Sequence, residues 1–198
     1  MSASSGFGPE TSVFSSDTTS AGIDELQFDL GEGPRWTALQ TRQPVLLPDV
    51  KLEAPVSWPV FSKAVSEFEV AAIFVFPLRV GAVDVGLIEM YSSTPGSLES
   101  ADYSLAIQLC EAASWHLLRY ILSLGPAEGT QSMEHSESTE RVSRRAIHQA
   151  TGMVLVQTGL SATNALLLLR AHAFSHDQTV HEVSRDVVSK RLDFTQQG

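Results

Sequence analysis

Residues 70–91 read VAAIFVFPLRVGAVDVGLIEMY, two runs rich in β-branched and aromatic residues on either side of Val80-Gly81-Ala82. Such runs around a short glycine-containing turn predict a β-hairpin in a half-buried sheet. Leu46 and Leu47, just ahead of Pro48, predict a short edge strand that accompanies it. The fold of the first part of the chain is expected to grow outward from this hairpin.

A long helix is expected after the hairpin, from Ser97 to about Leu124. Cys110 is expected on its apolar side, as a small buried hydrophobe. The residues that recur along it at spacings of three and four are Leu105, Leu109, Ala112, Ala113, His116, Leu117 and Tyr120. Sheet and helix together predict an α+β fold.

Two segments of low apolar content divide the 198-residue chain. Ten of the first twenty residues are Ser or Thr, a composition that buries too little surface to order itself. Residues 125–140, GPAEGTQSMEHSESTE, begin with a Gly-Pro breaker, which indicates a linker. The expected organisation is a disordered tail over 1–22, a first domain over 23–124, a linker over 125–140 and a second domain over 141–194.

Charge is distributed unevenly between these parts. The chain has a formal net charge of −10, which taken alone argues against nucleic-acid binding. Residues 1–140 contribute −13 and residues 141–198 contribute +3, so the acidic excess lies entirely in the first part. The single cysteine cannot form an intrachain disulfide, and neither a secretory signal nor a membrane span is recognisable. We therefore expect a cytoplasmic protein with no membrane partner.

Three short helices are predicted after the linker, over 139–158, 161–176 and 179–192. Gly159 is expected to end the first and Ser161 to cap the second, while Thr179 and Glu182 form a capping box for the third. A three-helix bundle is expected, with a core of Ile147, Ala150, Val154, Leu166, Leu169, Ala173, Val180, Val183 and Val187.

Basic residues form a stripe on the first of these helices. It consists of Arg141, Arg144, Arg145 and His148, with Gln149 one turn after Arg145. The stripe is either a footprint for phosphate or a solvated helix face. Gly152 favours the first interpretation, since a glycine costs a helix about 1 kcal/mol but lets another chain approach the backbone.

Residues 143–188 resemble an ANTAR module, the RNA-binding domain of bacterial transcription antiterminators. The residues that match its pattern are Arg144, Ile147, Gln149, Ala150, Gly152, Ala165, Leu169, Arg170 and Ala173. The departures are Thr151 in place of a common Lys, Asn164 in place of an acid, and Ser184 in place of Ala. The missing Lys removes one cation from the expected RNA face.

This resemblance implies binding to RNA hairpins whose formation excludes an overlapping terminator. The residues expected to bind RNA are Arg141, Arg144, Arg145, His148, Gln149, Ala150, Gly152 and Arg170. Because the module has few cations, two copies on tandem hairpins would bind better than one, and a homodimer is expected. The apolar run 166–169 fits either a dimer seam or the core of the bundle.

Residues 28–122 resemble the GAF domains that commonly precede ANTAR modules, through FDLGEGP at 28–34, residues 44–49, Trp58-Pro59 with Phe61, and residues 76–91. The resemblance implies a truncated GAF-like antiparallel sheet with flanking helices that senses a small ligand. Because the match begins late, either the domain is truncated or its true start lies upstream. Arg35 stands where Cys is frequent in this family, which disfavours a thiol-based sensor.

Four aromatic residues are candidates for a ligand pocket in the first domain. Trp36, Trp58, Phe74 and Phe76 line either such a pocket or the plain core of the sheet. No cofactor is expected.

Motifs for catalysis or metal binding are weak. His172 and His176 lie one turn apart without a third ligand at suitable spacing, and no phosphate loop or nucleophile motif is present, so neither an enzyme nor a metal site is expected. The leading hypothesis is an RNA-binding antitermination regulator controlled by its sensor domain. A DNA-binding helix-turn-helix and a protein-interaction or signalling module with degenerate RNA binding are the alternatives.

Overall fold

A computed structural model describes residues 2–5, 12–53, 57–123 and 138–195, with side chains for all of these except 2–5, 13, 53 and 138–145. The chain divides into two compact units, Met1–Ser132 and Met133–Gly198. Each unit is described by itself.

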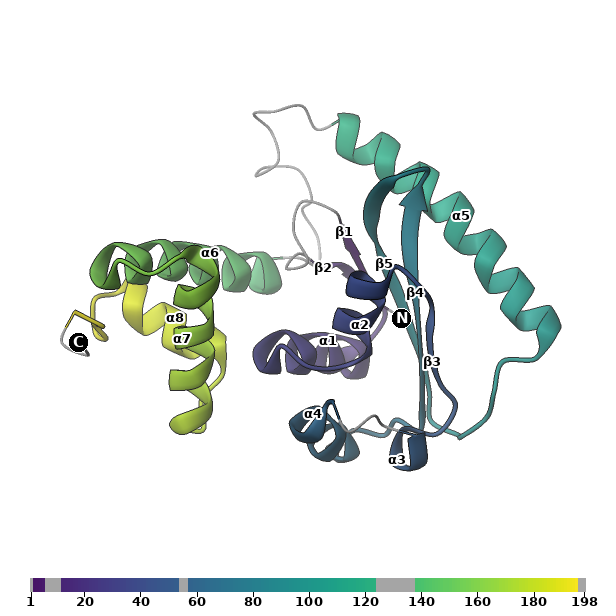
Figure 1. The fold of residues 1–198 in the computed structure, drawn as a ribbon, viewed down its shortest axis with the longest axis horizontal. Coiled ribbons are helices and arrows are strands. Elements are labelled where there is room, and N and C mark those ends of the chain that lie inside the picture. The colour runs from purple at the N-terminus through teal and green to yellow at the C-terminus, as the bar shows by residue number, and fades with distance from the viewer. Residues whose placement is uncertain (1, 6–11, 54–56, 124–137, 196–198) are drawn as a thin grey trace. The chain divides into compact units, whose positions relative to one another are not determined.

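The first unit is built on a five-stranded antiparallel sheet with the strand order β2-β1-β5-β4-β3 (Figure 1). Its strands are β1 (Ser2–Ser5), β2 (Ser12–Ser15), β3 (Val45–Leu47), β4 (Ala72–Val80) and β5 (Val83–Ser92). The predicted hairpin is confirmed, and Gly81 in its turn has a φ of +60°, which glycine adopts without strain. The predicted edge strand is also confirmed, since β3 pairs only with β4 among the described residues.

A disordered tail over 1–22 is contradicted by this sheet. β1 pairs with both β2 and β5, and α1 (Thr18–Leu30) begins within the expected tail. The helix start is fixed by Asp17, whose carboxylate accepts from the Ser20 N–H at 2.7 Å while the Ser20 hydroxyl accepts from the Asp17 N–H at 3.2 Å. Composition missed these strands because β1 depends on backbone pairing with β5, far along the chain, and β2 in turn pairs with β1.

Helices cover both faces of the sheet. On one face lie α1, α2 (Pro34–Thr41), α3 (Val50–Glu53), α4 (Pro59–Ala64) and the 3-10 turn η1 (Val65–Glu67). On the other face, α5 (Ser100–Ser123) is the only described helix of this unit, as Figure 1 shows. Alternate residues of β4 serve the two cores: Ile73 and Val75 pack under α1, α2 and α4, whereas Phe74 and Phe76 pack under α5.

The apolar side expected for α5 is only partly correct. Its buried residues are Ala106, Cys110 and Ser114. Small side chains on this face let the helix sit close to the sheet, with Tyr103, Ala113, Leu117, Leu118 and Ile121 packing beside them. Leu105, Leu109, Ala112 and His116, expected on the apolar side, are exposed. The helix thus has two apolar faces, of which the sheet covers one.

The second unit contains the three predicted helices, α6 (Ser138–Thr158), α7 (Ala162–Ser175) and α8 (Val180–Val188). Gly159 has a φ of +71° at the end of α6 and Ser161 caps α7, as expected. The capping box of Thr179 and Glu182 is confirmed, with bonds of 2.9 and 3.1 Å. α8 ends earlier than predicted.

The expected bundle core is confirmed except for Leu166, which is half-buried. Ala165 and Phe194 complete it. The run 166–169 is divided between environments, since Leu169 is fully buried and Leu167 is exposed. Among the described residues, no single helix combines the length and the hydropathy needed to cross a bilayer.

Candidate nucleic-acid interface

The helix α6 separates a buried face from an open one. Ile147, Ala150 and Val154 point into the bundle, whereas His148 and Gln149 are exposed. This amphipathic spacing is what fixes the rotation of the helix about its axis. Burial of the apolar face leaves the opposite face of α6 open to solvent, and any ligand of α6 must bind to this open face.

Gly152 lies on the open face of α6. It is exposed, and a methyl group built on its Cα would meet no atom within 4 Å. Glycine is thus not required here by packing, although it costs the helix about 1 kcal/mol relative to alanine. Gly152 therefore exposes helix backbone between Gln149 and Val156 on the open face. A partner that approaches this backbone would explain the glycine.

The candidate arginines are only partly described. Arg141, Arg144 and Arg145 belong to the first two turns of α6, but their side chains lie outside the described part of the structure. Arg170 in α7 is half-buried and already interacts within the chain. Ala150 is completely buried, so its side chain is excluded from any RNA-contacting surface.

Two further observations on α6 were not anticipated. Val156, one turn beyond Gly152, is 79% exposed, so the open face ends in an apolar side chain. The Thr151 hydroxyl, at the position where Lys is common, donates to the Ile147 carbonyl of its own helix at 2.8 Å. The polar group of Thr151 is therefore satisfied within the helix, and it supplies no charge to the surface.

Of the four aromatic candidates for a ligand pocket in the first unit, three belong to the two hydrophobic cores, as the alternative of a plain core implies. Trp58 is buried under α4 on one face of the sheet, whereas Phe74 and Phe76 are buried under α5 on the other. Trp36 is half-buried, and its indole N–H donates to the Gln27 carbonyl at 2.7 Å. Because Trp58 belongs to the core on one face of the sheet and Phe74 and Phe76 belong to the core on the other, these side chains do not line one cavity.

A buried polar network lies on the α1 side of the sheet. Arg35 in α2 is fully buried and forms an ion pair with Asp24 of α1 through its Nη1 atom. Its backbone N–H donates to the Gln27 Oε1 at 2.9 Å, and the Gln27 amide in turn donates to the Glu89 Oε1 at 2.5 Å. The network joins two helices to the central strand β5.

Not every polar atom of this network has a partner. Among the described residues, no hydrogen bond reaches the Nε and Nη2 atoms of Arg35 or the Oε2 atom of Glu89. Burial raises the pKa of the Glu89 carboxyl to about 7; Arg35 opposes this shift and Asp24 adds to it. A neighbouring hollow lined by Ser20, Ile23, Ile73, Glu89 and Tyr91 has no room for a ligand as these side chains stand.

The network could have been suspected from one sequence signal. Residues 87, 89 and 91 lie on the same face of β5, because side chains alternate along a strand. Since Leu87 and Tyr91 are apolar or aromatic and face the core, Glu89 between them is an acid that also points inward. Cys110 is buried as expected, and burial raises the pKa of its thiol to about 11, which makes it unreactive at neutral pH. His172 and His176 stack at 4.0 Å, and no group of three metal-ligating side chains occurs among the described residues.

Comparison with known proteins agrees with both units. Residues 6–117, more than half of the chain, match the family model described as GAF domain. The chain therefore belongs to the GAF domain family, a class of sensor domains. In this chain the GAF domain is joined to a second module, because residues 138–188 match the model described as ANTAR domain. The two resemblances noted in the sequence are confirmed.

This domain pair defines a broad functional class. An ANTAR domain implies RNA-binding regulation of antitermination, and a GAF domain implies a sensor. Proteins that combine them are typically regulatory and not enzymatic.

A solved structure resembles part of the chain. It is described as the domain of a two-component sensor histidine kinase protein from Sinorhizobium meliloti 1021, with 17% identity and a TM-score of 0.37. The match covers 41% of this chain and 55% of that one, so this chain spans about half the length of that structure. A likeness at this level carries no conclusion about function. No curated protein matches the chain.

Proposed function

We propose that this protein binds tandem RNA hairpins in leader transcripts through the open face of α6, as a homodimer, and thereby prevents formation of an overlapping terminator. The observation that carries this proposal is the exposed pair Gln149 and Gly152, in line with the cationic positions 141, 144 and 145. Sequence-specific proteins read unstacked loop bases with side-chain amides and hold phosphates with arginine. The acidic GAF domain supplies control in response to a signal.

A protein-interaction module with degenerate RNA binding is the second candidate. Two observations favour it: Thr151 turns its hydroxyl into its own helix, and Val156 offers an apolar side chain on the open face. Salt dependence separates the two candidates, because phosphate contacts release counterions and apolar contacts do not.

The test is a titration of the full chain with tandem-hairpin RNA and with a matched DNA duplex at several salt concentrations. We expect selective, salt-sensitive RNA binding, and Arg144→Ala/Arg145→Ala should reduce the salt slope by about one unit per lost phosphate contact. Lys190→Ala/Arg191→Ala removes the same charge after α8 and should bind like the wild type. Equal losses in both double variants would mean that net charge alone matters, and binding to neither nucleic acid would leave the second candidate.

Gly152→Ala is expected to have opposite effects on stability and on RNA affinity. The added methyl group meets no atom, so the free energy of unfolding should rise by about 1 kcal/mol. RNA affinity should fall, because the methyl group stands where a ribose or phosphate approaches the helix backbone. Urea denaturation and the RNA titration measure the two effects. A variant that is more stable and binds RNA normally would remove Gly152 from the interface.

The GAF domain is proposed to sense a small ligand at its buried network instead of at the aromatic residues. The atoms without partners on Arg35 and Glu89 offer two donors and one acceptor, which suits a small polar molecule. Since the hollow beside them is closed, binding there requires the surrounding side chains to move.

A further inference from the structure

The buried network between α1, α2 and β5 contains an unequal number of acids and bases. Among the described residues, the only buried Asp, Glu, Lys, Arg or His side chains are Asp24, Arg35 and Glu89. One guanidinium therefore faces two carboxyl groups. Because an unbalanced buried charge is costly, the charges of this interior balance only when one of the two carboxyl groups holds a proton.

The hydrogen bonds assign that proton to Glu89. Asp24 is paired directly with the Arg35 guanidinium, which favours its ionised form. Glu89 is bonded instead to the neutral amide of Gln27, at 2.5 Å, and no hydrogen bond reaches its Oε2 atom within the described part of the chain. Glu89 is thus the carboxyl group that gains least from ionisation.

The neighbours of Glu89 supply no further charge to balance it. In the sheet it lies opposite Ser2 of β1 and Val75 of β4, both uncharged. On its own strand it is followed on the same face by Tyr91, whose phenol stays neutral because partial burial raises its pKa. The described groups that act on the charge of Glu89 are therefore Arg35, which favours ionisation, and Asp24, which opposes it.

Ionisation of Glu89 would act on the α1–α2 corner, residues 30–35, through the side chain of Gln27. The donors without partners in the network are Nε and Nη2 of Arg35, and the ionised carboxylate can take them only if Gln27 leaves its place between the two side chains. The corner is built on Gln27: its Oε1 atom accepts the Arg35 N–H at 2.9 Å, and a Cβ atom on Gly33 would lie 2.7 Å from its Cγ atom. The Trp36 indole, bonded to the Gln27 carbonyl, lies next to the corner.

We propose that the GAF domain is a proton sensor, in which Glu89 holds a proton while the α1–α2 corner is docked on β5, and loss of this proton releases the corner. A proton needs no cavity, so the closed hollow beside Glu89 does not prevent the response. The step transfers one proton between the Glu89 carboxyl and solvent and breaks no other covalent bond. The inference rests on the sensor role in the proposed function, for which it names the signal, but it does not depend on RNA binding.

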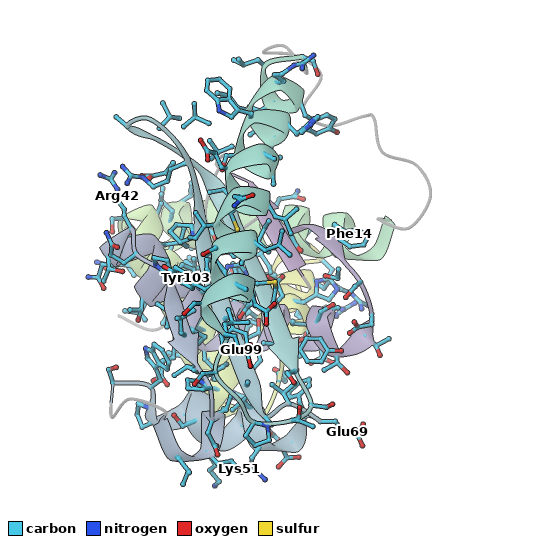
Figure 2. The ribbon with its side chains drawn as sticks, turned by 90° about the vertical axis from the view of Figure 1, so that its right-hand side faces the viewer. Phe14, Arg42, Lys51, Glu69, Glu99 and Tyr103 are labelled. Carbon is cyan, nitrogen blue, oxygen red and sulfur yellow. The ribbon has the colours of Figure 1, made fainter. Side chains whose placement is uncertain are left out.

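Tryptophan fluorescence of the full chain without RNA, from about pH 5.5 to about pH 8.5, tests the response. The wild type is expected to show a one-proton transition near pH 7, reported by Trp36, and Glu89→Gln should abolish it. Glu69→Gln is the matched control, because Glu69 is an exposed carboxylate at the lower edge of the view in Figure 2, and it should keep the transition. A wild type without a transition, or a transition that persists in Glu89→Gln and so belongs to a histidine or the amino terminus, would overturn the proposal.

The variant Asp24→Asn tests the balance of charges. It leaves one carboxyl group for one guanidinium, so Arg35 becomes available to the Glu89 carboxylate. The midpoint of the transition should fall by about one pH unit or more, which is at least a tenfold loss of proton affinity. Far-UV circular dichroism establishes that each variant is folded. An unchanged or higher midpoint would show that the two carboxyl groups do not compete for Arg35.

Amide hydrogen exchange tests the release of the corner. At about pH 8 the amides of residues 27–36 should exchange about tenfold faster in the wild type than in Glu89→Gln, and comparison at one pH removes the intrinsic pH dependence of exchange. Equal rates would refute the release. RNA binding by a protein without the pH transition would refute only this inference, whereas the transition without RNA binding would refute only the proposed RNA target.

Discussion

Arg35→Met is expected to lower the free energy of unfolding by about 3–5 kcal/mol. The Arg35 side chain is fully buried, and that of its partner Asp24 is only 5% exposed. Removing the guanidinium leaves a buried carboxylate without its counter-charge, and breaking a buried pair from one side costs far more than the pair itself contributes. Urea denaturation of the full chain, followed by far-UV circular dichroism, measures the loss.

Arg42→Met is the matched control for this variant. Arg42 pairs with Asp84 at 2.7 Å, but its side chain is 55% exposed, so the change should cost less than about 1 kcal/mol. The double variant Asp24→Leu/Arg35→Met removes both buried charges and should recover much of the loss. If Arg35→Met costs no more than Arg42→Met, the ion pair with Asp24 does not support the fold.

Glu89→Gln is expected to stabilise the protein above neutral pH. Burial raises the pKa of the folded-state carboxyl to about 7 from an ordinary value of 4.5. The folded state therefore holds its proton more tightly than the unfolded state, and wild-type stability falls as the pH rises from about 4.5 to about 7. Glutamine cannot ionise, so the variant should lose this decline and gain on the order of 3 kcal/mol over the wild type at pH 8.

Urea denaturation at pH 5, 6, 7 and 8 checks the prediction for Glu89. The wild type and the variant should be similar near pH 5 and should diverge as the pH rises. Glu69→Gln, which removes an exposed carboxylate outside the network, should follow the wild-type curve. A Glu89→Gln variant less stable than the wild type at pH 8 would mean that the ionised carboxylate is favoured by its partners.

Local patterns predicted the elements that local interactions determine. The hairpin around Gly81, the long helix and the three C-terminal helices follow from periodicity, turns and caps within a few residues. The capping box of Thr179 and Glu182 is an example, since both of its hydrogen bonds are made inside one turn. Helix ends that have no strong cap, such as that of α8, were placed less accurately.

Long-range partners explain what the sequence did not predict. The strands β1 and β2 are made of serine-rich segments; β1 pairs with β5, far along the chain, and β2 pairs with β1. On α5, helical spacing predicted the burial of Cys110 but also placed Leu105 and Leu109 on the apolar side, and both are exposed because the sheet covers a different face of the helix. The sequence did not show which aromatic residues lie together. Trp58 follows β3 in the chain, but the face of the sheet on which its side chain packs is determined by tertiary contacts.

The residues of the candidate RNA interface were predicted from the resemblance to the ANTAR module together with their spacing along the helix. Helical spacing placed Gln149 and Gly152 on the open face of α6, and the structure exposes both. The ion pair of Arg35 was not predicted, because a buried charge is recognised only when its partner from another element is known. The alternation along β5 could have indicated the inward Glu89, but it was not used.

The place of β1 in the sheet has a consequence for the order of events during synthesis. Ser2 lies opposite Glu89, so the first strand of this sheet to be synthesised pairs with the last one. Contacts between distant segments are the slow ones in folding. Until β5 has been synthesised, β1 can pair with β2 but lacks its partner on the other side. The sheet is therefore completed only after the β4–β5 hairpin has formed, when the earliest of its strands pairs with the latest.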